Sequence, residues 1–249
     1  MHGIRSHQMS YDSHERATIA KVLRRNVIQI VIGLILLAAV CCGILSWTPD
    51  HGEEWIARQV ELLGGTVSFE SDRITSIGIF NKKVPSNLLA AIKATSTLKE
   101  LWLIHTDFTD DELKQLMGVT GLKSLYLGDA LVTDAGLIHL KSLTNLRILE
   151  LNATHVTDSG IASLRTMKSL VWINLNHTQV TDTGLEYLSE LTSLRRLYLR
   201  HTNVTDAGLR HLANLESLQL LDLDETEVSA EGRAMLRKDL PDCQIDPNP

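Results

Sequence analysis

A segment of eight residues recurs in this chain at a fixed interval of 24, and this repeat limits the possible folds more than any other feature. Four copies agree closely: ALVTDAGL at 130–137, THVTDSGI at 154–161, TQVTDTGL at 178–185 and TNVTDAGL at 202–209. Two looser copies extend the series, TDFTDDEL at 106–113 and TEVSAEGR at 226–233. A catalytic loop is normally present once, so a segment present six times indicates the structural unit of a repeat protein.

Each repeat divides into a strand half and a helix half. The seven repeats begin, without insertions, at Ile74, Leu98, Leu122, Leu146, Leu170, Leu194 and Leu218. Their first, fourth and sixth positions are apolar, as in LRRLYL at 194–199, and the spacing of two between the last pair is that of a strand with one buried face. Leu209, Leu212 and Leu215 follow at intervals of three, which predicts one face of a short helix.

The recurring octet predicts the junction between strand and helix. In the copy at 202–209 we expect Val204 to be buried, Thr205 to cap the helix and Asp206 to lie in its first turn, where the helix dipole favours a carboxylate. Gly208 would allow close approach to a neighbouring repeat. Thr202 is expected to bond the backbone of a neighbouring loop, in a ladder with Thr106, Thr154 and Thr178. The octet is therefore interpreted as scaffold.

The pattern L-x-x-L-x-L-x-x-T-x-V-T-D-x-G-L-x-x-L-x-x-L resembles the leucine-rich repeat, in the 24-residue form common in bacterial proteins of that family. The resemblance covers about 74–245 and implies an α/β solenoid, a short horseshoe with a parallel sheet on the concave face and helices on the convex face. The repeats also resemble those of eukaryotic F-box leucine-rich proteins, but no F-box sequence is seen. The first and last repeats, with KKVPSNLL and TEVSAEGR, are atypical, as the ends of a solenoid must be.

The segment before the repeats predicts a cap for the N-terminal end of the solenoid. EEWIARQVELLGG predicts a helix that buries Ile56, Val60 and Leu63 and ends at Gly64 and Gly65. TVSFE at 66–70 predicts a strand. Residues 49–73 are thus assigned as linker and cap, 74–245 as the repeat domain with an atypical last repeat, and 246–249 as a tail.

A run of 24 uncharged residues between Arg25 and Asp50 is long enough to cross a bilayer as a helix. We expect a transmembrane signal-anchor helix at 26–48. Residues 1–25 carry five basic and two acidic side chains, which predicts a cytoplasmic N-terminal tail and an extracytoplasmic repeat domain. A cleaved signal peptide and a lipoprotein junction at Cys41 or Cys42 are the alternatives, although neither has a well-formed processing site.

Charge and motif content exclude several classes of function. Residues 26–249 carry 19 basic and 28 acidic side chains, and this excess of negative charge argues against nucleic acid as a partner. Cys243 is the lone cysteine beyond the uncharged run, so no disulfide framework is expected. The sequence has no P-loop, G-x-G-x-x-G, H-E-x-x-H or G-x-S-x-G motif, and we expect neither an enzyme nor a cofactor.

Positions 3, 5, 7 and 8 of each repeat are expected to face the hollow of the horseshoe. Seven strands about 4.8 Å apart would form a floor roughly 30 Å long, which suits a protein or peptide ligand. Large aromatic residues on this face are typical anchors of binding sites, although they also pack well on any exposed sheet. The candidate ligand-binding residues are Trp102, Tyr126, Asn152, Trp172, Asn174, Asn176, His177, Tyr198, Arg200 and His201.

The histidines and arginines of this face have simpler interpretations. His177 and His201 belong to adjacent repeats and are expected close to 5 Å apart, but the carboxylates of Asp129 and Glu225 are expected farther away, so no metal site is predicted. Arg196 and Arg200 are expected to pair with Asp222 and Asp224 of the next repeat. Sequons at Asn152, Asn176 and Asn203 arise from the repeat pattern.

Three functional hypotheses follow. The first is a membrane-anchored, non-catalytic module that binds a protein or peptide on the concave face. The second is an envelope structural or glycan-associating protein whose aromatic residues stack on sugars. The third, a substrate receptor of a ubiquitin ligase, rests only on the resemblance to F-box proteins and requires cytosolic repeats.

Overall fold

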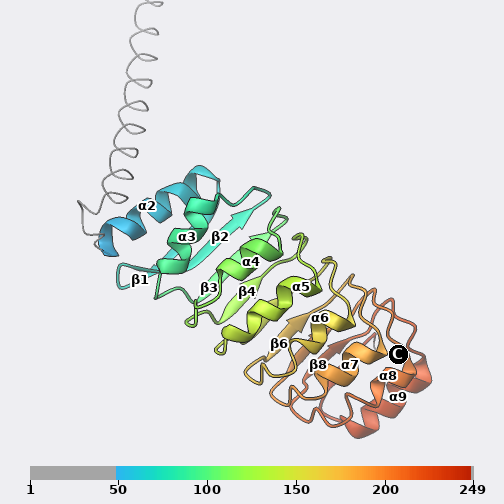
Figure 1. The fold of residues 1–249 in the computed structure, drawn as a ribbon. Helices are drawn as coiled ribbons and strands as arrows, with labels where there is room; N and C mark the ends of the chain where they lie inside the picture. The colour runs from blue at the N-terminus through green and yellow to red at the C-terminus, as the bar shows by residue number, and fades with distance from the viewer. Residues whose placement is uncertain (1–48, 248–249) are drawn as a thin grey trace, which may run out of the picture. The chain divides into compact units, whose positions relative to one another are not determined.

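The structure, a computed structural model, describes residues 49–247. The chain divides into two units, residues 1–51 and 52–249, and all but three of the described residues belong to the second unit. In this unit, strands and helices alternate along the chain, and each successive pair stacks on the one before it (Figure 1). The fold is the α/β solenoid that the repeat predicts.

A single nine-stranded sheet runs through the unit in the order of the sequence, β1 to β9. Every neighbouring pair is parallel except β1 and β2, which form an antiparallel hairpin. Two of the strands, β1 and β9, lie outside the seven strands expected from the repeats. The strands are β1 (Thr66–Glu70), β2 (Arg73–Phe80), β3 (Glu100–Ile104), β4 (Ser124–Tyr126), β5 (Ile148–Glu150), β6 (Trp172–Asn174), β7 (Arg196–Tyr198), β8 (Leu220–Asp222) and β9 (Gln244–Asp246).

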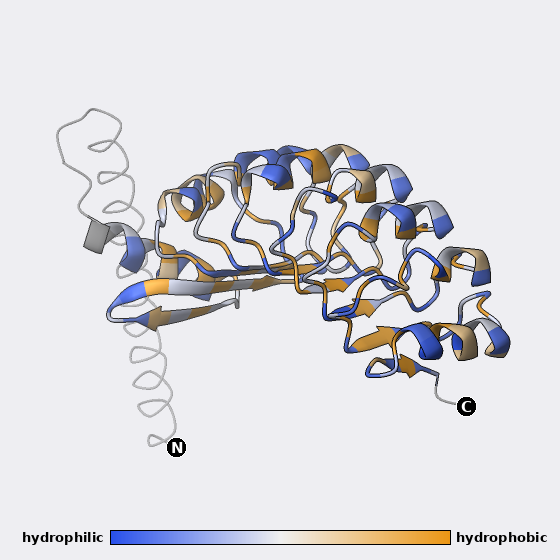
Figure 2. Cartoon of the chain, turned by 90° about the horizontal axis from the view of Figure 1, so that it is seen from below, coloured by the Kyte–Doolittle hydropathy of each residue, from blue (hydrophilic) through white to orange (hydrophobic). Residues whose placement is uncertain are grey.

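Short helices form the second layer, along the outer side of a curved arch whose inner side is the sheet (Figure 2). The helices are α2 (Pro49–Leu62), α3 (Ser86–Ala94), α4 (Asp110–Gln115), α5 (Asp134–Leu137), the 3₁₀ helix η1 (Ile138–Ser142), α6 (Asp158–Ala162), α7 (Asp182–Leu188), α8 (Asp206–Leu209) and α9 (Ala230–Asp239). The core lies between the two layers and consists of the periodic leucines. In the repeat that begins at Leu194, the residues Leu194, Leu197 and Leu199 of the strand half and Leu212 and Leu215 of the helical half are all fully buried.

The aspartate of the octet joins each repeat to the next, a contact that was not predicted from the sequence. Asp158 accepts a hydrogen bond from the backbone N–H of Thr181 at 2.8 Å and another from the Thr181 hydroxyl at 2.6 Å. Thr181 in turn caps α7 by accepting from the N–H of Thr183, as expected of this position. A Cβ on Gly184 would lie 2.6 Å from Asp158 Oδ1, so this glycine makes room for the aspartate of the preceding repeat.

We call this arrangement the Asp–Thr–Gly bridge. It occurs five times, from Asp110 to Asp206, and serine replaces threonine in the last copy. At the start of the series, Ser86 occupies the aspartate position and Glu112 occupies the glycine position. Glu112 accepts from the N–H and hydroxyl of Thr109 within its own repeat. At the other end of the series, Ala230 replaces the aspartate.

The expected threonine ladder is wrong. The Thr202 hydroxyl is buried and donates to the carbonyl oxygen of Leu199 in its own repeat at 2.6 Å. Thr154 and Thr178 bond Leu151 and Leu175 in the same way, also at 2.6 Å. Threonine reaches the carbonyl three residues earlier because the chain turns sharply after the strand, so these hydroxyls satisfy the turn of their own repeat.

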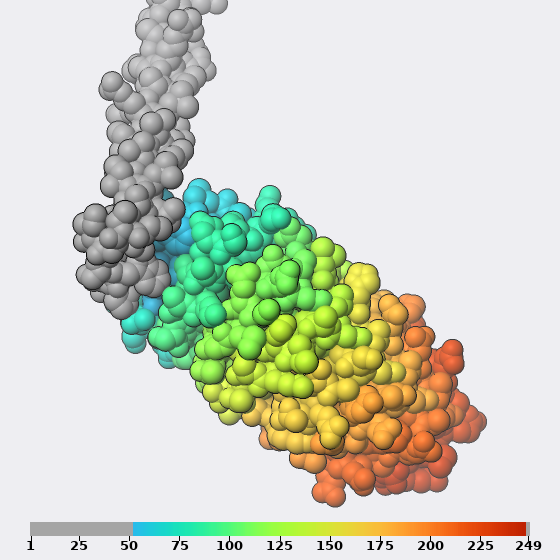
Figure 3. All heavy atoms as spheres, viewed as in Figure 1, coloured from blue at the N-terminus to red at the C-terminus, as the bar shows by residue number. Residues whose placement is uncertain are grey.

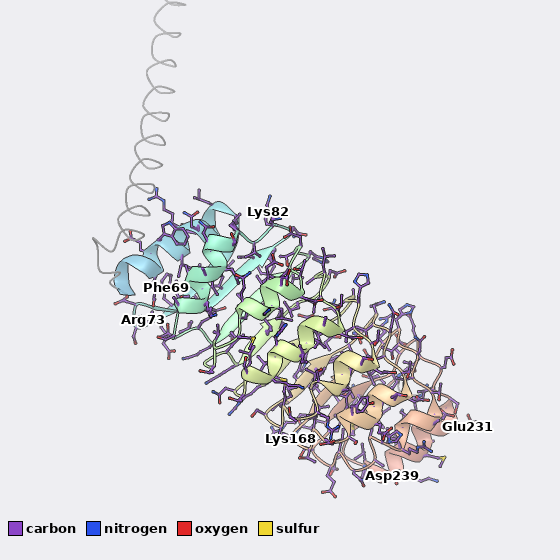
Figure 4. All side chains as sticks on the ribbon, viewed as in Figure 1. Phe69, Arg73, Lys82, Lys168, Glu231 and Asp239 are labelled. Atoms are coloured by element: carbon purple, nitrogen blue, oxygen red, sulfur yellow. The ribbon has the colours of Figure 1, made fainter. Side chains whose placement is uncertain are left out.

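Helix α2 and the β1–β2 hairpin cover the N-terminal end of the solenoid. Ile56 and Val60 of α2 are fully buried. The buried carboxylate of Glu53 accepts hydrogen bonds from Arg73 Nε and from the backbone N–H of Ile74, both at 2.6 Å, and so fixes α2 to β2. Gly64, with φ of +74°, ends the helix. Arg73 and Phe69 mark this end of the molecule in Figure 4.

The C-terminal end is closed by α9 and β9. Cys243 and Ile245 are buried beneath them. Burial raises the pKa of the Cys243 thiol to about 11, so the thiol stays protonated. Arg237 of α9 donates to the carbonyl oxygen of Ile245 at 2.9 Å and holds the helix against the last strand.

The expected membrane helix at 26–48 and the tail at 1–25 lie outside the described residues. Within residues 49–247, none of the helices has both the length and the apolar character needed to span a bilayer.

Candidate binding surface on the concave face

The structure brings the four predicted aromatic residues together in one continuous row. Trp102 and Tyr126 are paired on β3 and β4, and their rings are stacked, with centroids 3.5 Å apart and an interplanar angle of 8°. Tyr126 and Trp172 are 6.4 Å apart and inclined at 53°. Trp172 and Tyr198 are 5.4 Å apart and inclined at 52°. We call these four residues the aromatic row.

The aromatic row is half-buried because its members cover one another. Burial, reinforced by the charge of Glu100, raises the pKa of the Tyr126 hydroxyl above its usual range. Large rings that are already packed lose little side-chain freedom on binding, which is the property of an interface anchor. The row therefore offers a rigid apolar strip across five repeats.

Glu150 lies within this strip, and its importance could not be inferred from position alone. It is paired in register with Tyr126 of β4 and Asn174 of β6. Its carboxylate has one weak contact, from Asn174 Nδ2 at 3.5 Å. Burial raises the pKa of Glu150, and the nearby charge of Asp129 raises it further. In the sequence, Glu150 stands at a fifth position between those of Tyr126 and Tyr198, but nothing there indicates that its carboxylate is half-buried.

The asparagines of this face mainly support the backbone at the ends of the strands. Asn174 Oδ1 accepts from the N–H of Asn176 at 3.0 Å, and Asn176 Oδ1 accepts from the N–H of Arg200 at 2.7 Å. Asn152 Oδ1 is buried against Gly128 without a hydrogen-bond partner among the described residues. These three oxygens are therefore turned away from an incoming ligand, although all three residues lie where they were predicted.

The eighth position of every repeat has left-handed backbone geometry. His105, His177 and His201 have φ values of +53°, +56° and +54°. Polar residues adopt this conformation more readily than β-branched ones, and six of the seven repeats have His, Asn, Asp or Glu at this position; Ala153 is the exception. The rings of His177 and His201 are 4.5 Å apart, close to the expected separation.

The prediction that acidic residues lie far from the histidines is wrong. Glu225 contacts His201 Nε2, and Asp129 lies 3.2 Å from His105 Nδ1. Both carboxylates come from the eighth position of the next repeat, one strand spacing away. Even so, residues 49–247 contain no group of three or more His, Cys, Asp or Glu side chains arranged to hold a metal ion.

The two arginines predicted to pair with aspartates behave differently. Arg200 lies 3.4 Å from Asp224, as expected, and also contacts Glu225. The hydrogen bond and charge of Arg200 lower the pKa of Glu225. Arg196, by contrast, is exposed and forms no ion pair with any residue of 49–247, because it begins β7 opposite Leu220, whereas Asp222 ends β8 opposite Tyr198. The expected pair between Arg196 and Asp222 is wrong.

Two shallow hollows lie along the edge where the strands begin, and neither is lined by a residue of the aromatic row. One, of about 380 Å³, is lined by residues that include Arg73, Thr75 and Lys99. The other, of about 450 Å³, lies between Arg147 and Arg195. On the opposite, helical face, the successive repeats form adjacent bands along the molecule (Figure 3). The candidate residues therefore form an open surface and line neither of these hollows.

Comparisons with known proteins agree with this geometry. The family model described as a leucine-rich repeat matches residues 166–189 and 190–213. Residues 166–213 therefore match two consecutive leucine-rich repeats. A search of curated protein sequences finds no match.

Among solved structures, the chain is similar in fold to internalin C2 of Listeria monocytogenes. The two share 20% identity over 80% of this chain and 96% of that chain, with a TM-score of 0.56. A leucine-rich repeat protein of Leptospira interrogans shares 19% identity over 69% of this chain and 48% of its own, with a TM-score of 0.48. The PEPR1–AtPEP1 complex shares 17% identity over 72% and 25%, with a TM-score of 0.47.

Leucine-rich repeat domains are typically protein-binding modules and usually non-catalytic. The concave face of this protein has the components of such a module: rigid aromatic side chains, flanking charges and an open floor. The repeat pattern leaves the third and fifth positions variable, so the aromatic row is specific to this sequence and is not required by the fold.

Proposed function

We propose that the protein is a membrane-anchored, non-catalytic binding module that holds a protein or peptide ligand on the concave face of its repeats. The observation that carries the proposal is the aromatic row. Its four rings contact one another across five repeats and remain partly accessible. Aromatic residues in such positions contribute most of the binding energy in many protein interfaces.

The shape of the surface favours a macromolecular ligand. A small molecule is normally bound in a cavity that covers most of its surface, whereas the candidate residues here lie on an open sheet. The rings of Tyr126, Trp172 and Tyr198 are inclined to one another by 52° and 53°. Inclined rings form angular recesses that suit protruding side chains better than they suit the flat faces of consecutive sugars.

The anchoring part of the proposal rests on the sequence. The uncharged run at 26–49 and the basic residues before it support a single membrane helix with the repeats outside the cytoplasm. Protease treatment of intact and permeabilised cells tests this arrangement. We expect the repeat domain to be digested in cells whose outer barrier alone is opened, whereas protection of the domain there would place it in the cytoplasm.

Affinity capture from native membranes tests the binding function. The bait is the full chain, and a second bait carries Trp102, Tyr126, Trp172 and Tyr198 changed to Ala. A matched control carries Ala in place of Met117, Ile138 and Met235, which are exposed apolar residues of the helical half. Circular dichroism confirms that each bait is folded.

We expect a protein that is captured by the wild-type bait and by the control bait and is lost with the aromatic variant. Loss with the control bait instead would place the binding surface on the helices. Retention of isolated polysaccharide, with no protein captured, would favour the glycan-associating function.

A further inference from the structure

Glu150 occupies an energetically unfavourable position for a carboxylate. It lies in the third of five repeats spanned by the aromatic row, between Tyr126 on one neighbouring strand and Asn174 on the other. The rings of Tyr126 and Trp172, from the repeats on either side, approach to 6.4 Å over this repeat. A charged carboxylate in such surroundings loses part of its hydration free energy, and only a hydrogen-bonded or charged partner compensates for that loss.

The described residues provide little compensation. Glu150 forms no ion pair within residues 49–247, and its hydrogen bond from Asn174 is long, at 3.5 Å. The titratable groups that act on it are Tyr126, which is neutral at physiological pH, and Asp129, whose negative charge opposes ionisation. Glu100, by comparison, lies at the start of β3, beyond the span between Tyr126 and Trp172.

The surroundings of Glu150 suit a positive charge for two further reasons. The faces of tryptophan and tyrosine rings attract cations; Tyr126 is paired in register with Glu150, and Trp172 of the next strand lies 6.4 Å from the Tyr126 ring. The loop after the neighbouring strand β4 adds the negative charge of Asp129. A cation that reached Glu150 would therefore meet a carboxylate, two ring faces and a negative potential together.

We propose that Glu150 is a specificity-determining residue, which receives a lysine or arginine side chain of the protein ligand against the rings of Tyr126 and Trp172. The inference rests on the proposed binding function and extends it by stating the chemistry of the ligand: a segment in which a basic residue accompanies apolar ones. The apolar residues would contact the rest of the aromatic row. A bound ligand removes further water from the carboxylate, and only a cation offsets that cost, so the contact discriminates for a basic residue.

A random peptide display library is the probe that tests this proposal, because it presents basic, acidic and apolar residues in every combination. The full chain is immobilised, and the enriched peptides are sequenced for the wild type and for Glu150→Gln, which keeps the shape of the side chain and removes its charge. Glu100→Gln is the matched control. Glu100 lies at the start of β3 on the same face, and it is also a half-buried glutamate. The four-alanine aromatic variant serves as the control for the proposed function.

We expect wild type and Glu100→Gln to enrich peptides that contain lysine or arginine beside apolar residues, and Glu150→Gln to lose the basic preference. For one such peptide, Glu150→Gln should weaken binding by about tenfold or more, and Glu100→Gln by less than about threefold. Binding to wild type should also weaken as the pH falls through the raised pKa of Glu150, and this dependence should be absent in Glu150→Gln.

Enrichment of peptides without basic residues, or an unchanged basic preference in Glu150→Gln, would overturn the inference. If those peptides still fail to bind the aromatic variant, the proposed function stands. Failure of the folded wild type to enrich any peptide would instead contradict the peptide-binding function and the inference together.

Discussion

Replacement of Asp158 by alanine tests the Asp–Thr–Gly bridge, the feature that joins consecutive repeats. The carboxylate accepts two hydrogen bonds from Thr181, at 2.8 Å from the backbone N–H and 2.6 Å from the hydroxyl. A hydrogen bond to a charged group contributes about 1.5 kcal/mol or more, so the loss of both should lower the free energy of unfolding by about 3 kcal/mol. For a domain of this size, that loss lowers Tm by about 6 to 12 °C.

The assay is thermal unfolding followed by circular dichroism, with Asp111→Ala as the control. Asp111 is also in the first turn of a helix, so it shares the dipole interaction of Asp158, but it is exposed and makes no bridge to another repeat. We expect its replacement to lower Tm by about 2 °C or less. An equal decrease in Tm for both variants would refute the bridge as a stabilising contact. The helix dipole alone would then account for the effect of each aspartate.

Three further predictions concern the same scaffold and the concave face. Gly184→Ala should lower the free energy of unfolding by about 1 to 3 kcal/mol, because the new Cβ would lie 2.6 Å from Asp158 Oδ1. The double substitution Asp158→Ser with Gly184→Glu copies Ser86 and Glu112. In thermal unfolding it should recover most of the stability that Gly184→Ala loses. Thr178→Val should cost about 1 kcal/mol, measured in the same way, because the carbonyl of Leu175 loses its buried donor. Burial raises the pKa of Glu150, so its contribution to stability is present at acidic pH and is lost as the pH rises through the folded value. Glu150→Gln should therefore raise Tm relative to wild type more at pH 7 than near pH 4.5, and an equal difference at both pH values would contradict the assigned burial of the carboxylate.

The architecture could be predicted from the sequence because the same pattern of strand and helix positions occurs in seven repeats. Apolar residues at the first, fourth and sixth positions specify a strand with one buried face, and the leucines that follow specify a helix, so the buried face of each element could be identified residue by residue. The same register placed Trp102, Tyr126, Trp172 and Tyr198 on one face, and the structure brings their rings into contact.

Contacts between repeats were harder to predict because they depend on side-chain direction. Asp158 reaches Thr181 of the next repeat, whereas Thr178 bonds within its own repeat, and nothing in the period distinguishes the two cases. The exceptions in the series held the clue: Glu112 replaces glycine where Ser86 replaces the preceding aspartate. The rings of Tyr126 and Trp172 likewise approach to 6.4 Å across the repeat of Glu150, which position numbers alone do not reveal.

Site-specific photo-crosslinking tests the central claim, that the concave face binds a protein ligand, most directly. A photoreactive amino acid replaces Ile148, which is paired with Trp172 on the concave face, or Ile138, which is 52% exposed in η1 on the helical layer. Both variants of the full chain are irradiated in native membranes, and the masses of their crosslinked products are compared. The account predicts a covalent adduct with a protein from position 148 and none from position 138. An adduct from position 138 alone would contradict it.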